Sequence, residues 1–170
     1  MGGTITSQEV FGFLTPDQIH SISEHADRLS LQAGQVVYGR GDEATDFFIV
    51  LSGDVALRLP GRGGVSIIID QLQRGAIFGG ALTFTRSAYA LTAQCTEDSL
   101  LLRVQSGVMK SLMERDLQMG YHLQAYISNA YFNRYIDTMK KLQAIVMNLP
   151  IEAGAELQTD TELKRRSHHA

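Results

Sequence analysis

The stretch from Gly34 to Gly80 decides the fold of this chain: GQVVYGRGDEATDFFIVLSGDVALRLPGRGGVSIIIDQLQRGAIFGG. Short runs of β-branched and aromatic residues alternate in it with turns rich in glycine and aspartate, which is typical of antiparallel strands. The run DFFIVL is apolar along most of its length and too short for an isolated helix, which indicates a buried strand. Four runs are therefore expected to be strands: residues 36–38, 46–51, 55–59 and 65–72.

Turn residues separate these runs. Ser52, Gly53 and Asp54 provide turn chemistry with a glycine available for a positive φ, and they predict a hairpin between the second and third strands. Residues 60–64, PGRGG, break the chain again before the fourth run. Several short strands at this spacing predict an antiparallel sandwich or barrel.

The composition limits the classes of function. The 170 residues are 44% hydrophobic, enough for one domain with a sizeable core. A net charge of −3 gives no basic face for nucleic acid. The chain has neither an apolar run of about 18 residues nor a secretory leader, so we expect no membrane partner and a cytoplasmic protein. Cys95 is the single cysteine, which excludes an intramolecular disulfide.

The strand region has a helix before it and two further strands at its end. Thr15, Pro16 and Gln18 have the pattern of a capping box with proline at the first helical position, so a helix should begin there and end near Ala26. A first strand is then expected from Leu29. The last two strands are predicted at residues 89–95 and 99–104, where the barrel closes.

Three segments carry a resemblance to a known family. They are LQAGQVVYGRGDEATDFFIVLSGDV (31–55), LQRGAIFGGAL (72–82) and RSAYALTAQCTEDSLLLRV (86–104). Together they resemble the cyclic nucleotide-binding domain, the jelly-roll sensor of catabolite activator-type regulators, kinase regulatory subunits and some channels. The resemblance implies a mainly β fold: an antiparallel jelly-roll barrel, cupin-like, with flanking helices and a long C-terminal helix.

The same resemblance implies a ligand site. In the family, a phosphate-binding cassette reads Phe-Gly-Glu-Leu-Ala-Leu, then a short insert, then Arg-Ser-Ala; its amides and arginine bind the cyclic phosphate, and its glutamate accepts from the ribose 2′-hydroxyl. The corresponding ligand-binding residues here are Phe78, Gly79, Gly80, Ala81, Leu82, Arg86, Ser87 and Ala88. The sequence departs from the pattern twice: Gly80 stands in the place of the glutamate, and the insert of residues 83–85 is shorter.

These departures leave several interpretations of the pocket. Loss of the glutamate removes a charge-assisted hydrogen bond of about 1.5–3 kcal/mol, which weakens nucleotide binding without abolishing it. The pocket then binds a cyclic nucleotide, is adapted to another ligand, or is vestigial. On the plainer interpretation, Arg86 is a solvated turn residue and Gly79-Gly80 only shapes a tight turn.

The pattern becomes helical after Gln105. A short helix is expected around Val108, Leu112 and Met113, and Asp116 is the expected N-cap of a long helix that ends before Pro150. One face of the long helix suits packing on the barrel: Leu123, Tyr126, Ile127, Ala130 and Tyr131.

A second apolar row on the long helix follows a heptad spacing. Its members are Phe132, Tyr135, Met139, Leu142, Val146 and Leu149, and we call this row the seam. A second copy of the helix would cover it, so we predict a homodimer, in agreement with the family resemblance. The alternative is that the seam packs within the chain.

The predicted organisation has three parts. Residues 10–115 form the barrel with its N-terminal helix, residues 116–149 form the helix that dimerises and acts as a lever, and residues 150–170 form a flexible tail. The tail is too short and polar for a helix-turn-helix module, so no DNA-binding part is expected after the long helix.

The leading functional hypothesis is a stand-alone sensor that binds a small molecule and acts on a protein partner. The resemblance implies cyclic AMP or cyclic GMP as ligand, no resident cofactor is predicted, and occupancy of the barrel by haem is left open. The alternatives are a dimeric scaffold with a degenerate pocket and, less favoured, a metal-independent cupin-type enzyme. We expect no enzyme, because residues 29–104 contain no histidine and Asp46, Asp70 and Glu97 are placed like solvated turn formers.

Overall fold

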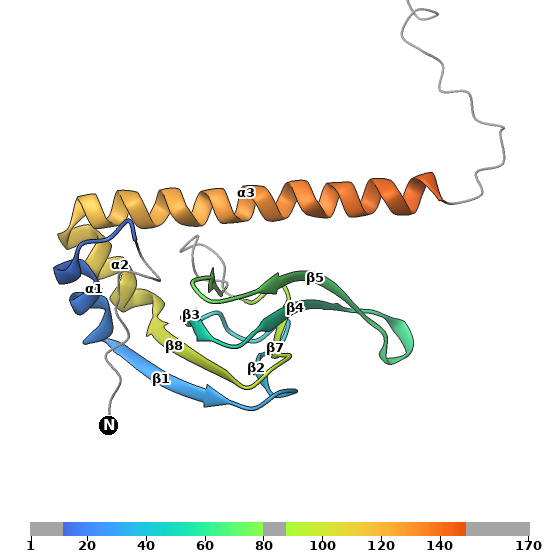
Figure 1. Cartoon of the computed structure of the whole chain (residues 1–170), viewed down its shortest axis with the longest axis horizontal. Coiled ribbons are helices and arrows are strands. Elements are labelled where there is room, and N and C mark those ends of the chain that lie inside the picture. Colours follow the sequence, from blue (N-terminus) through green and yellow to red (C-terminus); the bar gives the residue numbers. More distant parts are fainter. Residues whose placement is uncertain (1–11, 80–87, 149–170) are drawn as a thin grey trace, which may run out of the picture. The chain divides into compact units, whose positions relative to one another are not determined.

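The computed structural model describes residues 12–79 and 88–148 (Figure 1). Its elements in chain order are α1 (Pro16–Ser23), β1 (Ala26–Leu31), β2 (Val36–Tyr38), β3 (Asp46–Ser52), β4 (Val55–Pro60), the 3-10 turn η2 (Arg62–Gly64), β5 (Ser66–Leu72), β6 (Ile77–Phe78), β7 (Thr92–Cys95), β8 (Ser99–Gln105), α2 (Ser106–Arg115) and α3 (Leu117–Met147). The strands form two four-stranded antiparallel sheets, in the orders β1-β8-β3-β6 and β2-β7-β4-β5.

This arrangement confirms the mainly β, jelly-roll-like fold, but the described strands form two separate sheets and not one closed barrel. The predicted hairpin at Gly53 is wrong. β3 pairs with β8 and β6, whereas β4 pairs with β5 and β7, so the turn carries the chain from one sheet to the other. The predicted break between the third and fourth strands is the real hairpin, because Pro60 lies opposite Ser66 in the β4–β5 ladder.

Polar side chains hold that crossing in place. The Asp54 amide donates to the Ser99 hydroxyl oxygen at 3.2 Å, and the Thr96 hydroxyl donates to a carboxylate oxygen of Asp54 at 2.8 Å. Asp54 and Ser99 are both buried, and buried polar groups require such partners. The turn before β4 and the turn before β8 are therefore bound to each other where the chain passes between the sheets.

The predicted capping box is present at the start of α1. The Gln18 amide donates to the Thr15 hydroxyl oxygen at 3.3 Å, and the Thr15 amide donates to the Gln18 side-chain oxygen at 3.0 Å. The predicted end near Ala26 is wrong. α1 ends at Ser23 and β1 begins at Ala26, earlier than predicted, because all six residues of β1 pair with β8.

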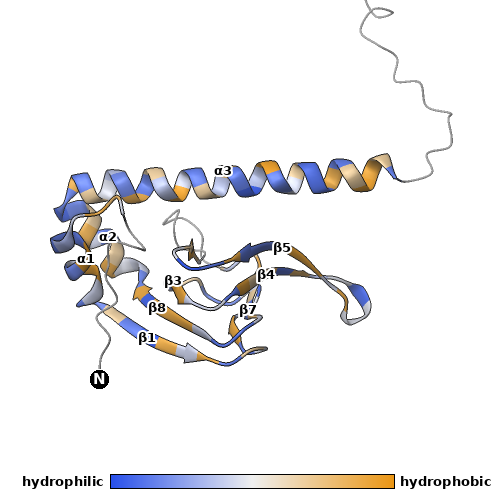
Figure 2. Cartoon of the chain, viewed as in Figure 1, coloured by the Kyte–Doolittle hydropathy of each residue, from blue (hydrophilic) through white to orange (hydrophobic). Residues whose placement is uncertain are grey.

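β3 is buried on both of its faces, which explains why its sequence is apolar without alternation. Phe47, Ile49 and Leu51 pack with α1, α2 and α3, while Phe48 and Val50 pack between the two sheets. Figure 2 shows the hydrophobic residues of β3 and β8, and the mixture of hydrophobic and hydrophilic residues along α3. The sheet that contains β3 is thus the middle layer, with helices on one face and the second sheet on the other.

α3 begins as predicted, because a carboxylate oxygen of Asp116 accepts from the Met119 amide at 2.9 Å. Leu123 and Ile127 are buried in the cluster that α3 shares with α1, α2 and β3. The chain divides into two compact units, residues 1–136 and 137–170, with the division inside α3. In the second unit, the described residues are helical through Met147 and include an ion pair of 3.6 Å between Asp137 and Lys140.

Candidate functional site

The site expected from the sequence begins at Phe78 and ends at Ala88, and its middle, residues 80–87, lies outside the described residues. Both of its ends are described. The Tyr89 hydroxyl donates to the Asp46 carbonyl at 3.1 Å and accepts from the Asp46 amide at 3.2 Å. Ala88 forms an isolated bridge with Glu43. The end of the site at Ala88 is therefore anchored next to the start of β3.

Gly79 has a specific structural requirement. Its φ is +122°, and an added Cβ would lie 2.6 Å from the Asp46 carbonyl oxygen and 3.3 Å from Phe47 Cα. Backbone atoms cannot move aside as a flexible side chain can, so glycine is needed for the close approach of this residue to β3. The Gly79 carbonyl also accepts from the Tyr131 hydroxyl of α3 at 3.1 Å. Gly79 is thus a point of contact between β3, the start of the site and α3.

An aromatic cluster lies behind the site. The rings of Tyr38 and Tyr89 are stacked with centroids 3.7 Å apart, and Phe48 and Phe78 stack at 5.3 Å. Tyr38 joins the two pairs, with centroids 5.6 Å from Phe48 and 6.1 Å from Phe78. Burial, and then the neighbouring phenols of Tyr131 and Tyr89, raise the pKa of Tyr38, while the Arg134 guanidinium acts in the opposite direction. The Tyr38 phenol is therefore neutral at physiological pH.

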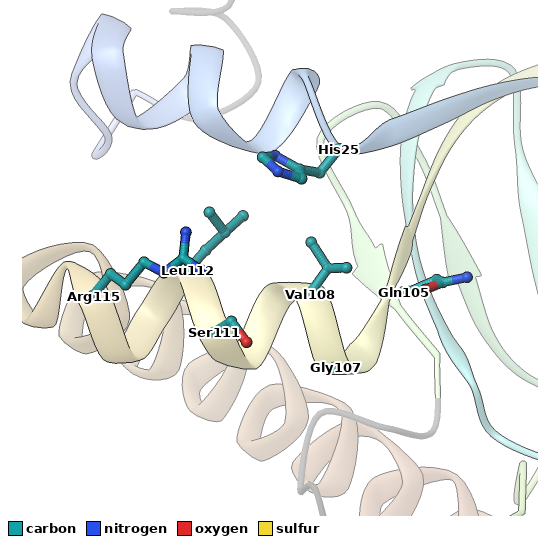
Figure 3. Close-up of a pocket in the computed structure, with 7 residues that line it drawn as sticks. All are labelled: His25, Gln105, Gly107, Val108, Ser111, Leu112 and Arg115. Atoms are coloured by element: carbon teal, nitrogen blue, oxygen red, sulfur yellow. The ribbon is translucent and has the colours of Figure 1, made fainter.

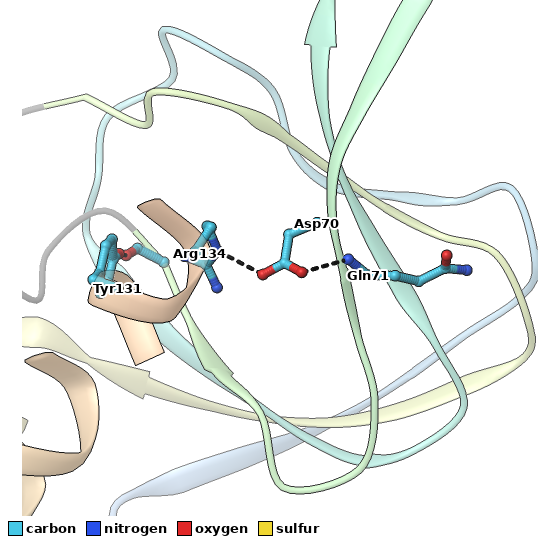
Figure 4. Close-up of polar contacts among 5 residues, drawn as sticks. Asp70, Gln71, Tyr131 and Arg134 are labelled. Atoms are coloured by element: carbon cyan, nitrogen blue, oxygen red, sulfur yellow. Dashed lines mark hydrogen bonds and ion pairs between the residues drawn. The ribbon is translucent and has the colours of Figure 1, made fainter. Parts of the chain in front are cut away.

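α3 presents polar side chains to the same region. Tyr126 donates its hydroxyl to the Gly75 carbonyl at 3.0 Å, and burial raises the pKa of this phenol. Arg134 Nε donates to a carboxylate oxygen of Asp70 in β5 at 2.6 Å, and its guanidinium lies 5.0 Å from the Tyr131 ring centroid. Figure 4 shows Arg134 and Asp70 directed toward each other from the helix and the strand. These contacts connect α3 to β5 and to the segment that leads into the site.

The structure places only some of the predicted site residues. Phe78 is buried at the end of β6, Gly79 contacts β3 and α3, and Ala88 bridges to Glu43. The others lie outside the described residues: Gly80, Ala81, Leu82, Arg86 and Ser87. Five residues were not predicted for this region from the sequence: Tyr38, Asp70, Tyr89, Tyr131 and Arg134. Tyr131 was expected only to pack on the barrel, and Asp70 was interpreted as a solvated turn former, whereas it lies within β5 and pairs with Arg134.

Two pockets open on the described surface, and the first of them borders the aromatic cluster. One, of about 230 Å³, is lined by the carboxylates of Asp42, Glu43 and Asp46, by Arg103, and by rings of the aromatic cluster. The other, of about 360 Å³, lies between the turn after α1 and α2 (Figure 3). Its polar lining consists of exposed side chains, among them His25, Ser111 and Arg115.

Two further properties concern the described residues alone. No three His, Cys, Asp or Glu side chains come together there in a way that could hold a metal ion. None of the helices within residues 12–79 and 88–148 combines the length and apolar character needed to cross a membrane.

One protein family matches this chain over a long segment. The model of the family described as "Cyclic nucleotide-binding domain" matches residues 28–116, more than half of the chain. The chain belongs to the cyclic nucleotide-binding domain family. The match runs from β1 to the residue before α3 and includes the whole segment between Gly79 and Ala88. Family membership supports a ligand-sensing regulatory role for this domain.

Known proteins carry the same domain in different contexts. The mouse (Mus musculus) patatin-like phospholipase domain-containing protein 7 is 28% identical over 97 residues, which cover 57% of this chain but only 7% of the mouse protein. The similarity to that protein is thus confined to a small part of its length. Its phospholipase domain gives no ground for assigning an enzymatic activity to this cyclic nucleotide-binding domain.

Solved structures agree on the fold. The catabolite activator protein of Thermus thermophilus aligns with a TM-score of 0.65 at 23% identity, over 79% of this chain and 62% of that chain. CLP, a global regulator of Xanthomonas campestris that responds to c-di-GMP, aligns with a TM-score of 0.70 at 17% identity, over 91% of this chain and 71% of that chain. At these identities the likeness concerns the architecture of the domain and its long helix.

Proposed function

We propose that this chain is a sensor domain that binds a small ligand, with a cyclic nucleotide as first candidate, in a pocket of the β domain through the cassette-like residues 78–88. Occupancy of this site changes the position of α3, and α3 passes the signal to a protein partner in a homodimer. The observation that carries the proposal is the hydrogen bond from the Tyr131 hydroxyl to the Gly79 carbonyl, which connects the helix to the beginning of the expected ligand segment.

The energetic requirement of this mechanism is simple. A ligand shifts α3 only if it binds more tightly to one helix position than to the other. The contacts of Tyr126 with Gly75 and of Tyr131 with Gly79 supply such a dependence, because a movement of residues 75–79 away from α3 lengthens both hydrogen bonds. Tyr131 and Tyr126 therefore transmit the signal in this proposal, and the ligand contacts lie in residues 80–88.

A second candidate function is a dimeric scaffold whose pocket no longer binds nucleotide. It is favoured by Gly80 in the position of the family's glutamate, and by the exposed apolar side chains of the seam on α3. On this alternative, cyclic nucleotides have no effect on stability while dimerisation persists.

A thermal-unfolding titration with cyclic AMP, cyclic GMP and c-di-GMP tests the proposal. A ligand that binds only the folded protein adds about 2.7 kcal/mol at a concentration of a hundred times Kd, which corresponds to a rise in Tm of several degrees. Arg86→Ala should abolish the rise, because the cassette arginine would bind the phosphate. Arg62→Ala, which removes the same charge from the exposed turn between β4 and β5, is the matched control and should retain it.

The outcomes separate the candidates. A rise in Tm that Arg86→Ala removes and Arg62→Ala retains supports a nucleotide sensor. A flat response to all three nucleotides rejects the nucleotide ligand, and a flat response from a protein that still dimerises favours the scaffold.

A further inference from the structure

The pocket of about 230 Å³ beside the aromatic cluster is separate from the expected ligand segment. The residues that line it come from β1, β2, β3 and β8, from the segment between β2 and β3, and from Tyr89, and none of them belongs to residues 78–88. A water molecule takes up about 30 Å³ of the liquid, so the pocket has room for a small molecule of roughly five to eight non-hydrogen atoms.

The charges around this pocket are mainly negative. Arg103 is the one cation among its lining residues, and its guanidinium donates to a carboxylate oxygen of Asp27 at 2.8 Å. The hydrogen bond to Asp27, and to a smaller extent the charge of Asp46, raise the pKa of Arg103 against the effect of burial. Because Asp27 offsets the charge of Arg103, the carboxylates of Asp42, Glu43 and Asp46 leave the pocket with a net negative charge.

These carboxylates retain acceptor capacity. Asp42 accepts one hydrogen bond, from the Gly39 amide at 2.7 Å, and Asp46 accepts one from the Thr45 hydroxyl at 2.8 Å. Glu43 has no side-chain hydrogen bond or ion pair within residues 12–79 and 88–148. An ionised carboxylate has two oxygens and about four acceptor positions, so all three groups can accept from a further donor.

A buried phenol is an independent indication of a ligand at this place. Tyr38 lines the pocket and is 9% exposed, yet its hydroxyl has no hydrogen-bond partner in the described part of the chain. Buried tyrosine hydroxyls usually have a partner. The phenol is neutral, so its oxygen can accept from an N–H donor. The Arg134 guanidinium, whose charge acts on this phenol from α3, is itself paired with Asp70.

The remaining lining favours an organic cation over a metal ion. No three His, Cys, Asp or Glu side chains of the described ranges are placed to hold a metal ion together, so the carboxylates do not converge on one point. Leu29, Val37 and the rings of Phe48 and Tyr89 supply apolar walls. An ammonium group on a short alkyl chain matches both parts of the lining, because its N–H groups donate to carboxylates and its chain packs on apolar side chains.

We propose that this pocket binds a small primary amine in its ammonium form, with Glu43 as the ion-pair partner of the ligand. This site is additional to the proposed nucleotide site and shares no residue with it. The ligand lies beside Asp46 and Tyr89, whose hydrogen bonds anchor the end of the expected ligand segment at Ala88.

The test uses the full chain labelled with ¹⁵N and follows the backbone amide signals of residues 42–48 and 89. n-Butylammonium chloride is titrated at constant ionic strength, with sodium chloride as the reference salt and n-butanol as a neutral molecule with the same alkyl chain. We expect saturable shifts of these signals with n-butylammonium and none with sodium chloride. n-Butanol should bind at least roughly tenfold more weakly, because it forms no charge-assisted hydrogen bond.

One pair of variants tests the role of Glu43. Glu43→Gln keeps the shape of the side chain and removes its charge, so n-butylammonium should bind at least roughly tenfold more weakly. The fold does not depend on this carboxylate, because it has no partner among the described residues. Glu114→Gln is the matched control. Glu114 is 66% exposed on α2, does not line the pocket, and should leave the affinity unchanged.

Weaker binding in Glu43→Gln alone supports the proposal. Shifts of equal size with sodium chloride, equal affinity for n-butanol, or equal affinities of the two variants would overturn it. Nα-acetyl-lysinamide distinguishes the source of the amine: binding as tight as that of n-butylammonium indicates a lysine side chain of a polypeptide, and weaker binding indicates a free amine. The outcome is independent of the nucleotide titration, because the two experiments concern different residues.

Discussion

Gly53 and Gly63 both have a positive φ, but their surroundings differ. An alanine Cβ at Gly53 would collide with the Ser99 hydroxyl and would lie 2.5 Å from the Asp98 carbonyl oxygen, whereas a Cβ at Gly63 meets no atom within 4 Å. Gly63 is thus required only for its positive φ, whereas Gly53 is required both for its positive φ and because no room exists for a Cβ. This difference reflects position, because Gly53 lies where the chain crosses between the sheets and Gly63 lies in the exposed turn between β4 and β5.

We therefore expect Gly53→Ala to lower the free energy of unfolding by about 2–4 kcal/mol, from backbone strain and overpacking together. Gly63→Ala should cost roughly 1 kcal/mol, from the strained φ alone. Urea unfolding followed by circular dichroism measures both values. Equal losses in the two variants would contradict the structure at the crossing.

Asp116 gives stability a dependence on pH. The hydrogen bond from the Met119 amide, and then that from the Gln18 side chain, lower the pKa of Asp116 below its usual value. The unfolded state therefore binds more protons than the folded state around and below pH 4, so the contribution of Asp116 is fully present above the unfolded pKa and is lost as pH falls through the folded pKa.

The variant Asp116→Asn removes this titration. We expect the wild type to be the more stable protein above about pH 5 and the two stability curves to converge below about pH 4. Urea unfolding at a series of pH values measures the difference. Curves that stay parallel across the whole range would show that the cap does not depend on ionisation.

At the scale of elements, α3 is attached to the β6 side of the first sheet through two phenols. Tyr126 reaches the Gly75 carbonyl and also stacks on Phe13 with centroids 4.8 Å apart, and Tyr131 reaches the Gly79 carbonyl. Residues 75 to 79 are in turn bound to β3, because the Gly75 amide donates to the Val50 carbonyl at 2.8 Å. The helix is therefore connected to β3 through the segment that precedes the expected ligand site.

Replacement of both phenols by phenylalanine should loosen that segment. The double variant Tyr126→Phe, Tyr131→Phe loses two hydrogen bonds at about 0.5–1.5 kcal/mol each, with the lower value for the more exposed Tyr131. Because these hydrogen bonds oppose local opening, their loss should make hydrogen exchange at the amides of residues 75–79 faster. Tyr135→Phe is the control, because Tyr135 is 58% exposed and its hydroxyl has no hydrogen-bond partner among residues 12–79 and 88–148. If exchange is unchanged in the double variant, the two phenols do not connect α3 to residues 75–79.

Local signals in the sequence predicted the elements well. The capping box at Thr15, the N-cap at Asp116 and the apolar run of β3 depend on neighbours within four residues, so they are visible without a structure. The partner of each strand depends on distant residues. A turn such as Ser52-Gly53-Asp54 has the same composition whether it closes a hairpin or crosses between sheets, which is why the hairpin was predicted wrongly.

At the scale of the whole molecule, the sequence suggested site residues only where a family pattern covers them. Phe78, Gly79 and Ala88 belong to that pattern, whereas Arg134 and Asp70 are single charged residues on a helix and a strand with no motif around them. Their association depends on how α3 lies against β5, which local sequence does not specify. The low exposure of the Arg134 side chain, 13%, is visible only in the structure.

The homodimer is the remaining prediction at this scale. In α3 the side chains of Phe132, Tyr135, Met139, Leu142 and Val146 follow each other at intervals of three and four residues and are exposed, while Leu149 lies outside the described residues. Leu142 is 50% exposed. Apolar residues at this spacing are covered when two copies of a helix pack along a common seam.

Leu142→Glu should therefore dissociate the dimer, because two carboxylates would be buried at the seam, one from each copy. A cost of about 3 kcal/mol or more corresponds to a dimer Kd at least roughly a hundredfold weaker. Gln143→Glu adds the same charge at the adjacent exposed position and should leave the dimer intact. Sedimentation velocity of the full chain over a range of concentrations measures both. A wild type that sediments as a monomer, or equal weakening by the two variants, would mean that the seam is not a dimer contact. α3 would then have to pass its signal to the protein partner without a homodimer.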